Sequence, residues 1–381
     1  MNKAEQILLQ AIQKSLWNRN ITFSPDIDWD AALQEAADQA VLGIVIGFAP
    51  TEIQKEWKGR ASAEMAHFIR ILHSQGQLYM LLRDNGIPVV ILKGTAAAIY
   101  YPNPSQRSMG DIDFLVPSEH FEQAKELLEQ NGYTIKDDPR VPRHIHVDKE
   151  GIIYELHRFF SYEGIDLERF VNDGFRNIEY RSICGIDFPM LPKLANGLVL
   201  LGHVAQHLKS GVGLRQVIDW MMYVSCELND SFWNDSFCIA AREVGVDTVA
   251  IVITRMCQVY LGLSEEIQWC KEGDIDLCSE LMDSLLSSGN FDRKRGRGAA
   301  VETVRSMIAR EGLFRHLQTV GEYNWKAYHK HKWLKPLAWI YQIGRYAKQG
   351  FHAKRGTHLR EDLARGKRRS NMINQLKIGK Q

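Results

Sequence analysis

The sequence VVILKGTAAAIYY at residues 89–101 is followed closely by RSMGDIDFLV at residues 107–116. The first stretch predicts a buried strand that ends at a Lys-Gly-Thr turn, where a helix begins. The second predicts another apolar strand, which carries Asp111 and Asp113 two residues apart. Because side chains alternate along a strand, both carboxylates should face one side while Ile112 and Phe114 face the core.

Two carboxylates on one face repel each other unless a cation lies between them. Oxygen ligands in this arrangement favour Mg²⁺ or Mn²⁺. A solvated strand edge is the alternative interpretation, but the apolar residues around Asp111 and Asp113 favour the interior of a sheet. The pattern is typical of metal-dependent phosphoryl transfer, in which charge neutralisation matters more than a nucleophilic side chain.

The turn before the helix offers groups that suit a phosphate. Gly94 allows close approach to the backbone, and the N–H groups at a helix start favour an anion, with the Thr95 hydroxyl as a further donor. Lys93 and Arg107 are candidates for neutralising phosphate charge. Gly-Thr before a helix is also ordinary capping, and Arg107 has the alternative of pairing with one of the two aspartates.

A third carboxylate lies in the next segment. HIHV at 144–147, DKEG at 148–151 and IIYELHRFF at 152–160 predict a β-hairpin with its turn at 148–151. Glu155 should share one face with Ile153 and His157, opposite Tyr154 and Leu156. A buried acid is costly, so we expect a cation or metal beside Glu155. The histidines of this hairpin, His144, His146 and His157, are interpreted as surface or structural residues.

The segment LGHVAQHLKSGVGLRQVIDW at 201–220 carries further polar residues. His203 and His207 share a helix face, but a metal site lacks a third ligand nearby in sequence, so core or hydrogen-bonding roles are favoured. Lys209 and Arg215 are expected to bind the triphosphate or the acceptor from the far side of the cleft.

These motifs together resemble a known family. Leu92-Lys93-Gly94-Thr95, Arg107, the stretch 110–116 and Glu155-Leu156-His157 resemble the uncharacterised bacterial nucleotidyltransferases of the DNA polymerase beta-like superfamily. The pattern is also similar to nucleotidyltransferases of abortive-infection toxin systems, although their turn has two glycines where this chain has only Gly94. The resemblance covers residues 85–160 and extends to about residue 225.

The resemblance implies a nucleotidyltransferase that moves NMP from an NTP, such as ATP, to a hydroxyl or phosphate acceptor and releases pyrophosphate. Asp111 and Asp113 would bind two divalent ions, Mg²⁺ or Mn²⁺, and Glu155 would bind the second ion and activate the acceptor. Gly94 and Thr95 would hold the outer phosphates. The acceptor stays open between a small molecule, a peptide and RNA; the alternatives are a toxin-like tRNA nucleotidyltransferase and a non-catalytic nucleotide-binding module.

The expected fold class is α+β, with a polymerase beta-like core, a small mixed sheet with helices, embedded between helical regions. Residues 1–84 should form a helical N-terminal region and residues 85–191 the catalytic core, including a helix at 119–132 that ends at Gly132. Residues 192–320 should form a helical domain that closes the cleft. Residues 321–381 should form a basic, aromatic-rich helical tail.

Composition sets outer limits on these expectations. The 381 residues are 45% hydrophobic and 24% charged, which is enough for a large core and more than one subdomain. The sequence shows neither a leader pattern nor an apolar run long enough to span a membrane, so a cytoplasmic location is expected. The six cysteines form no Cys-x-x-Cys pair and are interpreted as reduced thiols rather than a disulfide framework or zinc site.

The C-terminal tail has a strong charge bias. Residues 321–381 contain 15 Lys or Arg and three acids, a balance of +12. Cations and aromatic residues alternate there in a way that suits nucleic-acid binding. Packing of Trp333, Trp339 and Tyr346 against the body is the favoured interpretation, and contact with an anionic membrane surface is a further alternative.

Overall fold

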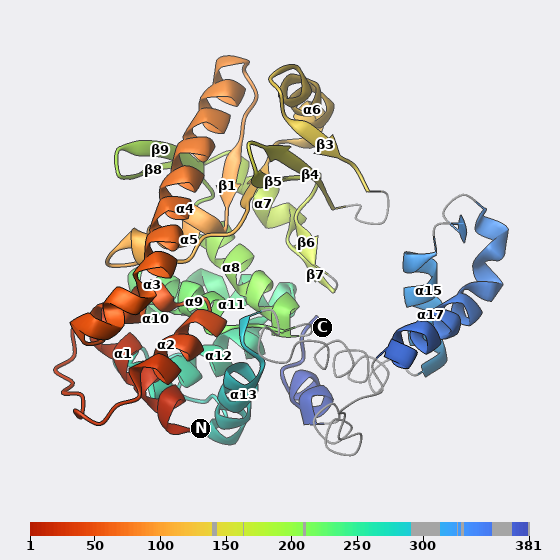
Figure 1. Ribbon diagram of the computed structural model, residues 1–381. Helices are drawn as coiled ribbons and strands as arrows, with labels where there is room; N and C mark the ends of the chain where they lie inside the picture. The colour runs from red at the N-terminus through yellow and green to blue at the C-terminus, as the bar shows by residue number, and fades with distance from the viewer. Residues whose placement is uncertain are drawn as a thin grey trace.

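The computed structural model describes residues 1–138, 143–162, 164–208, 211–290, 313–325, 327–328, 331–352 and 368–379. Within these residues the chain forms a mixed seven-stranded sheet and a body of helices beside it (Figure 1). The strands of this sheet are β1 (Val90–Leu92), β2 (Ile112–Leu115), β3 (Thr134–Lys136), β4 (His144–Lys149), β5 (Ile152–His157), β8 (Glu179–Ile183) and β9 (Ile186–Met190). A separate pair joins β6 (Ser161–Tyr162) to β7 (Ile165–Asp166).

The strand order β3-β4-β5-β2-β1-β9-β8 places β2 in the interior of the sheet. β2 runs antiparallel to β1 and parallel to β5. In this register Asp113 lies opposite Leu92 on one side and Glu155 on the other. The α+β class and the mixed sheet flanked by helices confirm the fold expected from the sequence.

The predicted hairpin forms between β4 and β5, with His144 paired to His157 at its open end. Its turn is shorter than the expected 148–151, because the strands extend to Lys149 and from Ile152. Glu150 and Gly151 make a two-residue turn with φ angles of 54° and 73°. Positive φ at both central residues matches the right-handed twist of the strands and allows this tight connection.

The helices are α1 (Lys3–Trp17), α2 (Trp29–Asp38), α3 (Leu42–Val45), α4 (Thr51–Asp84), α5 (Gly94–Ala98), α6 (Phe121–Gln130), α7 (Glu168–Phe175), α8 (Lys193–Leu208), α9 (Leu214–Glu227), α10 (Asp230–Phe232), α11 (Cys238–Glu243), α12 (Asp247–Met256), α13 (Ile275–Ser288), α15 (Leu313–Asn324) and α17 (Ala338–His352). Shorter helical turns include η2 (Pro104–Gln106), η3 (Ser118–His120), η5 (Cys257–Leu261) and η7 (Lys332–Leu337). α6 confirms the helix expected at 119–132, and Gly132 follows it with a φ of 80°. None of the helices in the described part of the chain has the length and apolar character needed to cross a membrane.

Two hydrophobic cores hold these elements together. The long helix α4 buries Phe68, Leu72 and Leu82 in the core that it shares with the sheet. The other core joins α1–α3, through residues such as Leu8 and Ile12, to the helices from α8 to α13. The segment 1–84, expected to be one helical region, is therefore divided between the two cores; the division of the chain into domains stays a prediction.

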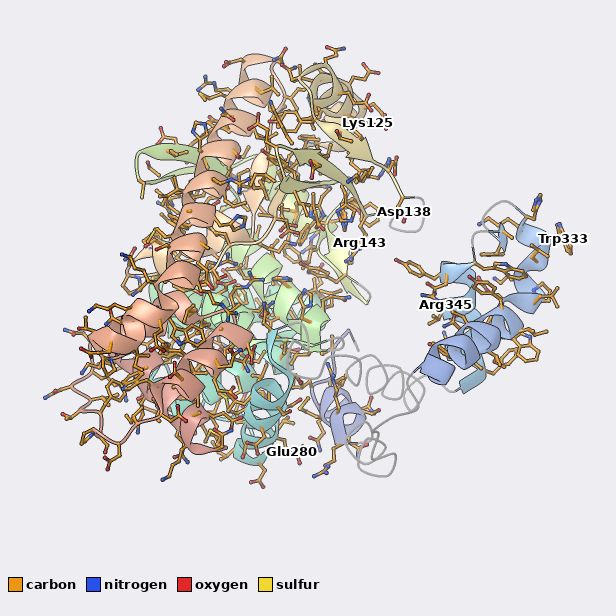
Figure 2. The ribbon with its side chains drawn as sticks, in the orientation of Figure 1. Lys125, Asp138, Arg143, Glu280, Trp333 and Arg345 are labelled. Carbon is orange, nitrogen blue, oxygen red and sulfur yellow. The ribbon has the colours of Figure 1, made fainter. Side chains whose placement is uncertain are left out.

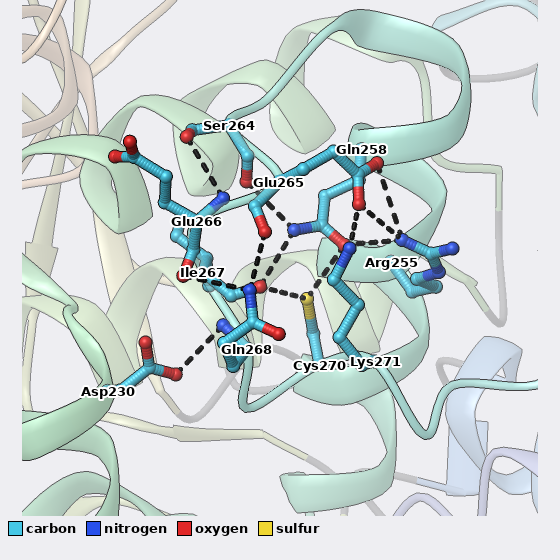
Figure 3. Close-up of polar contacts among 10 residues, drawn as sticks. All are labelled: Asp230, Arg255, Gln258, Ser264, Glu265, Glu266, Ile267, Gln268, Cys270 and Lys271. Carbon is cyan, nitrogen blue, oxygen red and sulfur yellow. Dashed lines mark hydrogen bonds and ion pairs between the residues drawn. The ribbon is translucent and has the colours of Figure 1, made fainter.

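A polar network fixes the loop that follows η5 in the helical body (Figure 3). Gln258 donates hydrogen bonds to the carbonyl oxygens of Ser264 and Ile267, at 2.8 Å and 2.9 Å. Arg255 donates to Gln258 at 2.8 Å and pairs with Glu265 at 3.1 Å. Because Gln258 is buried, these bonds satisfy its polar side chain and tie the loop to η5.

The tail has two described parts. α15 and α17 pack on each other, with the rings of Trp325 and Tyr341 stacked at 5.2 Å. Trp333 in η7 is 74% exposed, so the expectation that it packs is wrong (Figure 2). At the chain end, Leu376 is buried and the N–H of Gly379 donates to Gly245 at 2.9 Å. Residues 368–379 therefore pack against the helical body.

Candidate active site

The structure brings the three predicted carboxylates together. Asp113 and Glu155 lie opposite each other on the parallel strands β2 and β5. Asp111 directly precedes β2 rather than lying within it, and it is solvent-exposed. One carboxylate oxygen from each residue lies within 4.8 Å of the others. Parallel pairing of β2 with β5 is what places a carboxylate from the hairpin beside the Asp-x-Asp motif.

These carboxylates line a cavity of about 280 Å³. The opposite charges on its wall come from Lys93, Arg107, Arg143 and Arg215. Arg143 precedes β4 and is labelled in Figure 2. Its guanidinium donates to the carbonyl oxygen of Ser161 at 3.3 Å. A cavity lined by both acids and cations has the charges needed to bind a cation and an anion together.

Lys93 makes the closest contact with the acidic group. Its Nζ lies 2.5 Å from Oδ1 of Asp113, and both side chains are buried. His157 Nε2 lies 2.9 Å from the same oxygen. Burial alone would raise the pKa of Asp113, but the Lys93 ammonium and the His157 hydrogen bond hold it well below its usual range. Asp113 is therefore ionised.

The backbone at this turn is unusual. Lys93 has a φ of 51° and Gly94 a φ of 28°, both in a region that side chains disfavour. A Cβ at position 94 would be strained and would lie 4.0 Å from the carbonyl oxygen of Asp111. The positive φ that glycine tolerates therefore sets the turn where α5 begins, and Gly94 lines the cavity.

The other two carboxylates have the opposite pKa shift. Burial, together with the negative charge of Asp113, raises the pKa of Glu155 to about 8. Desolvation within the cavity and the charge of Asp113 also raise the pKa of Asp111, although it is the most exposed of the three. Three carboxylates this close cannot all ionise readily without added positive charge. Their oxygens are the donors that Mg²⁺ and Mn²⁺ prefer, so the residues present fit a hard divalent cation.

Arg107 pairs with Asp219 rather than with Asp111 or Asp113. Two guanidinium nitrogens donate to the two Asp219 oxygens, each at 2.7 Å, and both side chains are buried. The Tyr101 hydroxyl donates to the same carboxylate at 2.8 Å. Because Asp219 balances its charge, Arg107 anchors the segment before β2 to α9 while still lining the cavity.

Arg215 holds the same segment from α9. Its Nη1 donates to the carbonyl oxygen of Ser108 at 3.2 Å. Burial and the neighbouring Arg107 charge lower the pKa of Arg215. The segment that ends at Asp111 is therefore fastened by two arginines.

The hydroxyl of Thr95, predicted to bind phosphate, makes a different contact. The Thr95 hydroxyl donates to Oε1 of Gln75 on α4 at 2.6 Å, and Thr95 is buried. This bond directs the hydroxyl to α4 and not to the cavity. Lys209 lies outside the described residues.

Sequence reasoning predicted no catalytic or binding role for several residues that the structure places at the site. His157 and His144 line the cavity, and the period of two along β5 had already placed His157 on the face of Glu155. His203 and His207 also line it, with ring centroids 4.5 Å apart. Asp219 has no local signal, because its partner Arg107 is 112 positions away.

Comparison with known proteins identifies the family of this chain. No curated protein matches the chain. Among solved structures, an antigenic nucleotidyltransferase-like protein from Paracoccidioides brasiliensis aligns with 51% of this chain and 93% of its own, at 14% identity and a TM-score of 0.31. The model of a family described as uncharacterised nucleotidyltransferase matches residues 25–262, more than half of the chain and all three carboxylates. The chain therefore belongs to this family of uncharacterised nucleotidyltransferases.

Proposed function

We propose that this protein is a metal-dependent nucleotidyltransferase that moves NMP from an NTP to a hydroxyl or phosphate acceptor. The observation that carries the proposal is the approach of Asp111, Asp113 and Glu155 within 4.8 Å, in a cavity that also contains cationic side chains. In the reaction an acceptor oxygen forms a bond to the α-phosphorus. The bond between that phosphorus and the α,β-bridging oxygen breaks, and pyrophosphate leaves.

Asp111, Asp113 and Glu155 are the residues that would hold Mg²⁺ or Mn²⁺. Such ions, when bound, neutralise phosphate charge and stabilise the entering and leaving oxygens. Glu155 has a second proposed role, as the base that takes the proton of an acceptor hydroxyl. Without a metal ion its pKa is raised to about 8 by burial and by the charge of Asp113; a bound cation would lower that pKa, so that the carboxylate is ionised and able to accept a proton.

The phosphate-binding role is proposed for the cations and the turn around the cavity. Lys93, Gly94, Arg107 and Arg215 all line it, which supports this assignment. For Thr95 the proposal rests on its backbone N–H, because its hydroxyl is bonded to Gln75. Lys209 keeps its proposed role from the sequence alone. Asp219 is proposed as a positioning residue that acts through Arg107.

The acceptor is proposed to be a small molecule, a peptide or RNA. A second cavity of about 630 Å³ shares Tyr162 with the first and offers room for it beside β6 and β7. A toxin-like action on tRNA is the rival enzymatic proposal, and nucleotide binding without turnover is the non-catalytic one. A cytoplasmic location also remains a proposal.

Transfer of label from NTP distinguishes these possibilities. The full-length protein is incubated with Mg²⁺ or Mn²⁺, a metabolite extract or total cellular RNA, and each NTP labelled at either the α- or the γ-phosphate. The expected result is α-label in the acceptor and γ-label in pyrophosphate. Transfer of γ-label to the acceptor would indicate a kinase instead. Nucleotide binding without release of pyrophosphate from any mixture would favour the non-catalytic module.

A further inference from the structure

His144 is a buried imidazole whose Nε2 lies 3.3 Å from a carboxylate oxygen of Glu155, in a contact that does not have the geometry of a hydrogen bond. Its relative exposure is 8%, and neither ring nitrogen makes a hydrogen bond within the described part of the chain. The ring lines the same cavity as the carboxylates. Leaving a buried imidazole nitrogen unsatisfied costs free energy, so a group that faces into a cavity in this state calls for a ligand.

The neighbours of His144 are metal-binding types. Its Nε2 lies 3.3 Å from Oε1 of Glu155, and His157 Nε2 lies 3.7 Å from Oε2 of the same carboxylate. One donor atom from each of the three residues lies within 4.8 Å of the others. Ligands at about 2.0–2.2 Å from a tetrahedral zinc ion are separated by about 3.3–3.6 Å, so the observed spacing requires little movement.

The fold explains why these residues meet. His144 and His157 are paired across the β4–β5 hairpin, and Glu155 lies two residues before His157 on the same face. The hairpin is closed by the two-residue turn at Glu150 and Gly151, so its register is fixed by the chain itself. The site therefore rests on a rigid element and not on a loop.

We propose that His144, His157 and Glu155 form a binding site for a first-row transition-metal dication of the Zn²⁺ class. Two imidazoles and one carboxylate favour such an ion over Mg²⁺, which prefers oxygen ligands and retains its waters. This donor set contains neither Asp111 nor Asp113, and Glu155 is the one residue that it shares with the carboxylate group. On binding, the ion would take Nε2 of the neutral His157 imidazole in place of its hydrogen bond to Asp113, and the ring proton would move from Nε2 to Nδ1, so that the imidazole stays neutral.

Metal titration of the full-length protein tests this site without any assay of activity. The protein is stripped with a chelator, and the exposed thiols Cys184 and Cys226 are replaced by serine so that they do not bind Zn²⁺. Zn²⁺ affinity is measured by competition with a chromogenic chelator, and Mg²⁺ affinity by calorimetry. Co²⁺ is used in parallel, because its visible absorption reports nitrogen ligands.

The variants separate the proposed site from the carboxylate site. His144→Gln breaks no hydrogen bond and should fold; we expect it to lower Zn²⁺ affinity at least tenfold and to change the Co²⁺ spectrum. Asp111→Asn should keep Zn²⁺ affinity while weakening Mg²⁺ binding. His120→Gln, on the exposed turn η3, is the matched control and should bind both ions as the parent does.

Three results would overturn the proposal: no Zn²⁺ binding by the parent, equal Zn²⁺ affinity in His144→Gln, or a loss in Asp111→Asn as large as in His144→Gln. The last would assign Zn²⁺ to the carboxylates. None of these results depends on nucleotidyl transfer, so the site and the proposed function fail or stand separately. Circular dichroism of each metal-free variant checks that it is folded.

Discussion

Lys93 and Asp113 form a buried ion pair at the centre of the site, with Nζ 2.5 Å from Oδ1. Asp113 is also the carboxylate that belongs to the proposed cation-binding group. In the proposed site a protein cation and a divalent ion would therefore share one ligand. Since a buried charge needs a partner, either cation can stabilise Asp113 when the other is removed.

Lys93→Met should destabilise the metal-free protein by about 3–5 kcal/mol, because it leaves the Asp113 charge buried without its ammonium partner. Mg²⁺ or Mn²⁺ should restore part of this loss. Chemical denaturation with chelator and with metal measures both effects. Arg83→Gln, which removes the exposed pair with Asp84, should have little effect on stability and be insensitive to metal. An equal loss for Lys93→Met with and without metal would mean that no ion shares Asp113.

The double substitution of Asp111→Asn with Asp113→Asn should abolish transfer while the protein stays folded. Removing the metal ligands removes several kcal/mol of transition-state stabilisation, so we expect the rate to fall by at least about 10³-fold. The rate of pyrophosphate release measures this, with circular dichroism as the test of folding. Asp187→Asn, at an exposed position of β9, is the control and should be fully active. Undiminished transfer by the folded double variant would refute the catalytic assignment.

Glu155→Gln should separate chemistry from binding. If Glu155 takes the acceptor proton, its amide should lower kcat by about 10²–10⁴-fold and change nucleotide affinity far less. Single-turnover rates and equilibrium nucleotide binding measure the two effects. Glu129→Gln, exposed on α6, serves as the matched control. Equal losses in both quantities would point to a structural or purely metal-binding role.

Much of this site could be predicted because the sequence patterns that reveal it lie within single short segments. The alternation of polar and apolar residues placed both aspartates on one face, and the same period placed Glu155 and His157 together on the hairpin. The Glu150-Gly151 turn fixes the hairpin register. The alternation of residues along each strand could not predict the parallel pairing of β2 with β5, which sets Asp113 opposite Glu155.

Other features depend on contacts between distant elements. The Thr95 hydroxyl was expected to meet a phosphate, but Gln75 from α4 accepts its hydrogen bond. Arg107 was expected at phosphate or at the acidic motif, but Asp219 from α9 holds it. Both partners lie on helices whose packing against the sheet leaves no mark in the local sequence around the motif. Residue propensity and the spacing of apolar residues predict the type of each element. They do not predict which side chain of a distant element will contact it.

Acid should destabilise the protein through His203 and His207. Burial, with the Lys93 charge as the next cause, lowers the pKa of His207 from 6.5 to about 4. Burial and His207 lower the pKa of His203 still further. A lowered pKa means that the unfolded chain binds the proton more tightly. The contribution of each neutral histidine to the free energy of unfolding is therefore fully present above pH 6.5 and is lost as pH falls from 6.5 towards 4. The loss is at most about 1.4 kcal/mol per pH unit for each group, and screening by solvent reduces it.

His207→Gln should reduce the loss of unfolding free energy per pH unit below pH 6.5, because the variant has one fewer buried group to protonate. Urea denaturation at several pH values between 4 and 8 measures it. His120→Gln should keep the slope of the parent, since His120 is exposed. A slope unchanged by His207→Gln would show that other groups control acid unfolding.

The final prediction concerns RNA and the basic tail. Trp333 projects from η7 with 74% of its surface exposed, and Lys332 and Lys335 flank it. An exposed ring between two cations is available for stacking on a base and for pairing with phosphates. If RNA binds here, released counterions should make its affinity fall steeply with salt, by about 0.7 in log–log slope for each phosphate neutralised.

Replacing Lys326, Lys330, Lys332 and Lys335 by Gln should therefore flatten the salt dependence, although the first two lie outside the described residues. Trp333→Ala should weaken binding at every salt concentration without changing the slope, because stacking releases no counterions. Lys125→Gln with Lys136→Gln, on the distant α6 and β3, is the control for a general loss of positive charge. Fluorescence titrations across a salt series measure all of these. No RNA binding at low salt, with label still transferred to a small molecule or peptide, would remove the tRNA proposal and leave Trp333 without a nucleic-acid role.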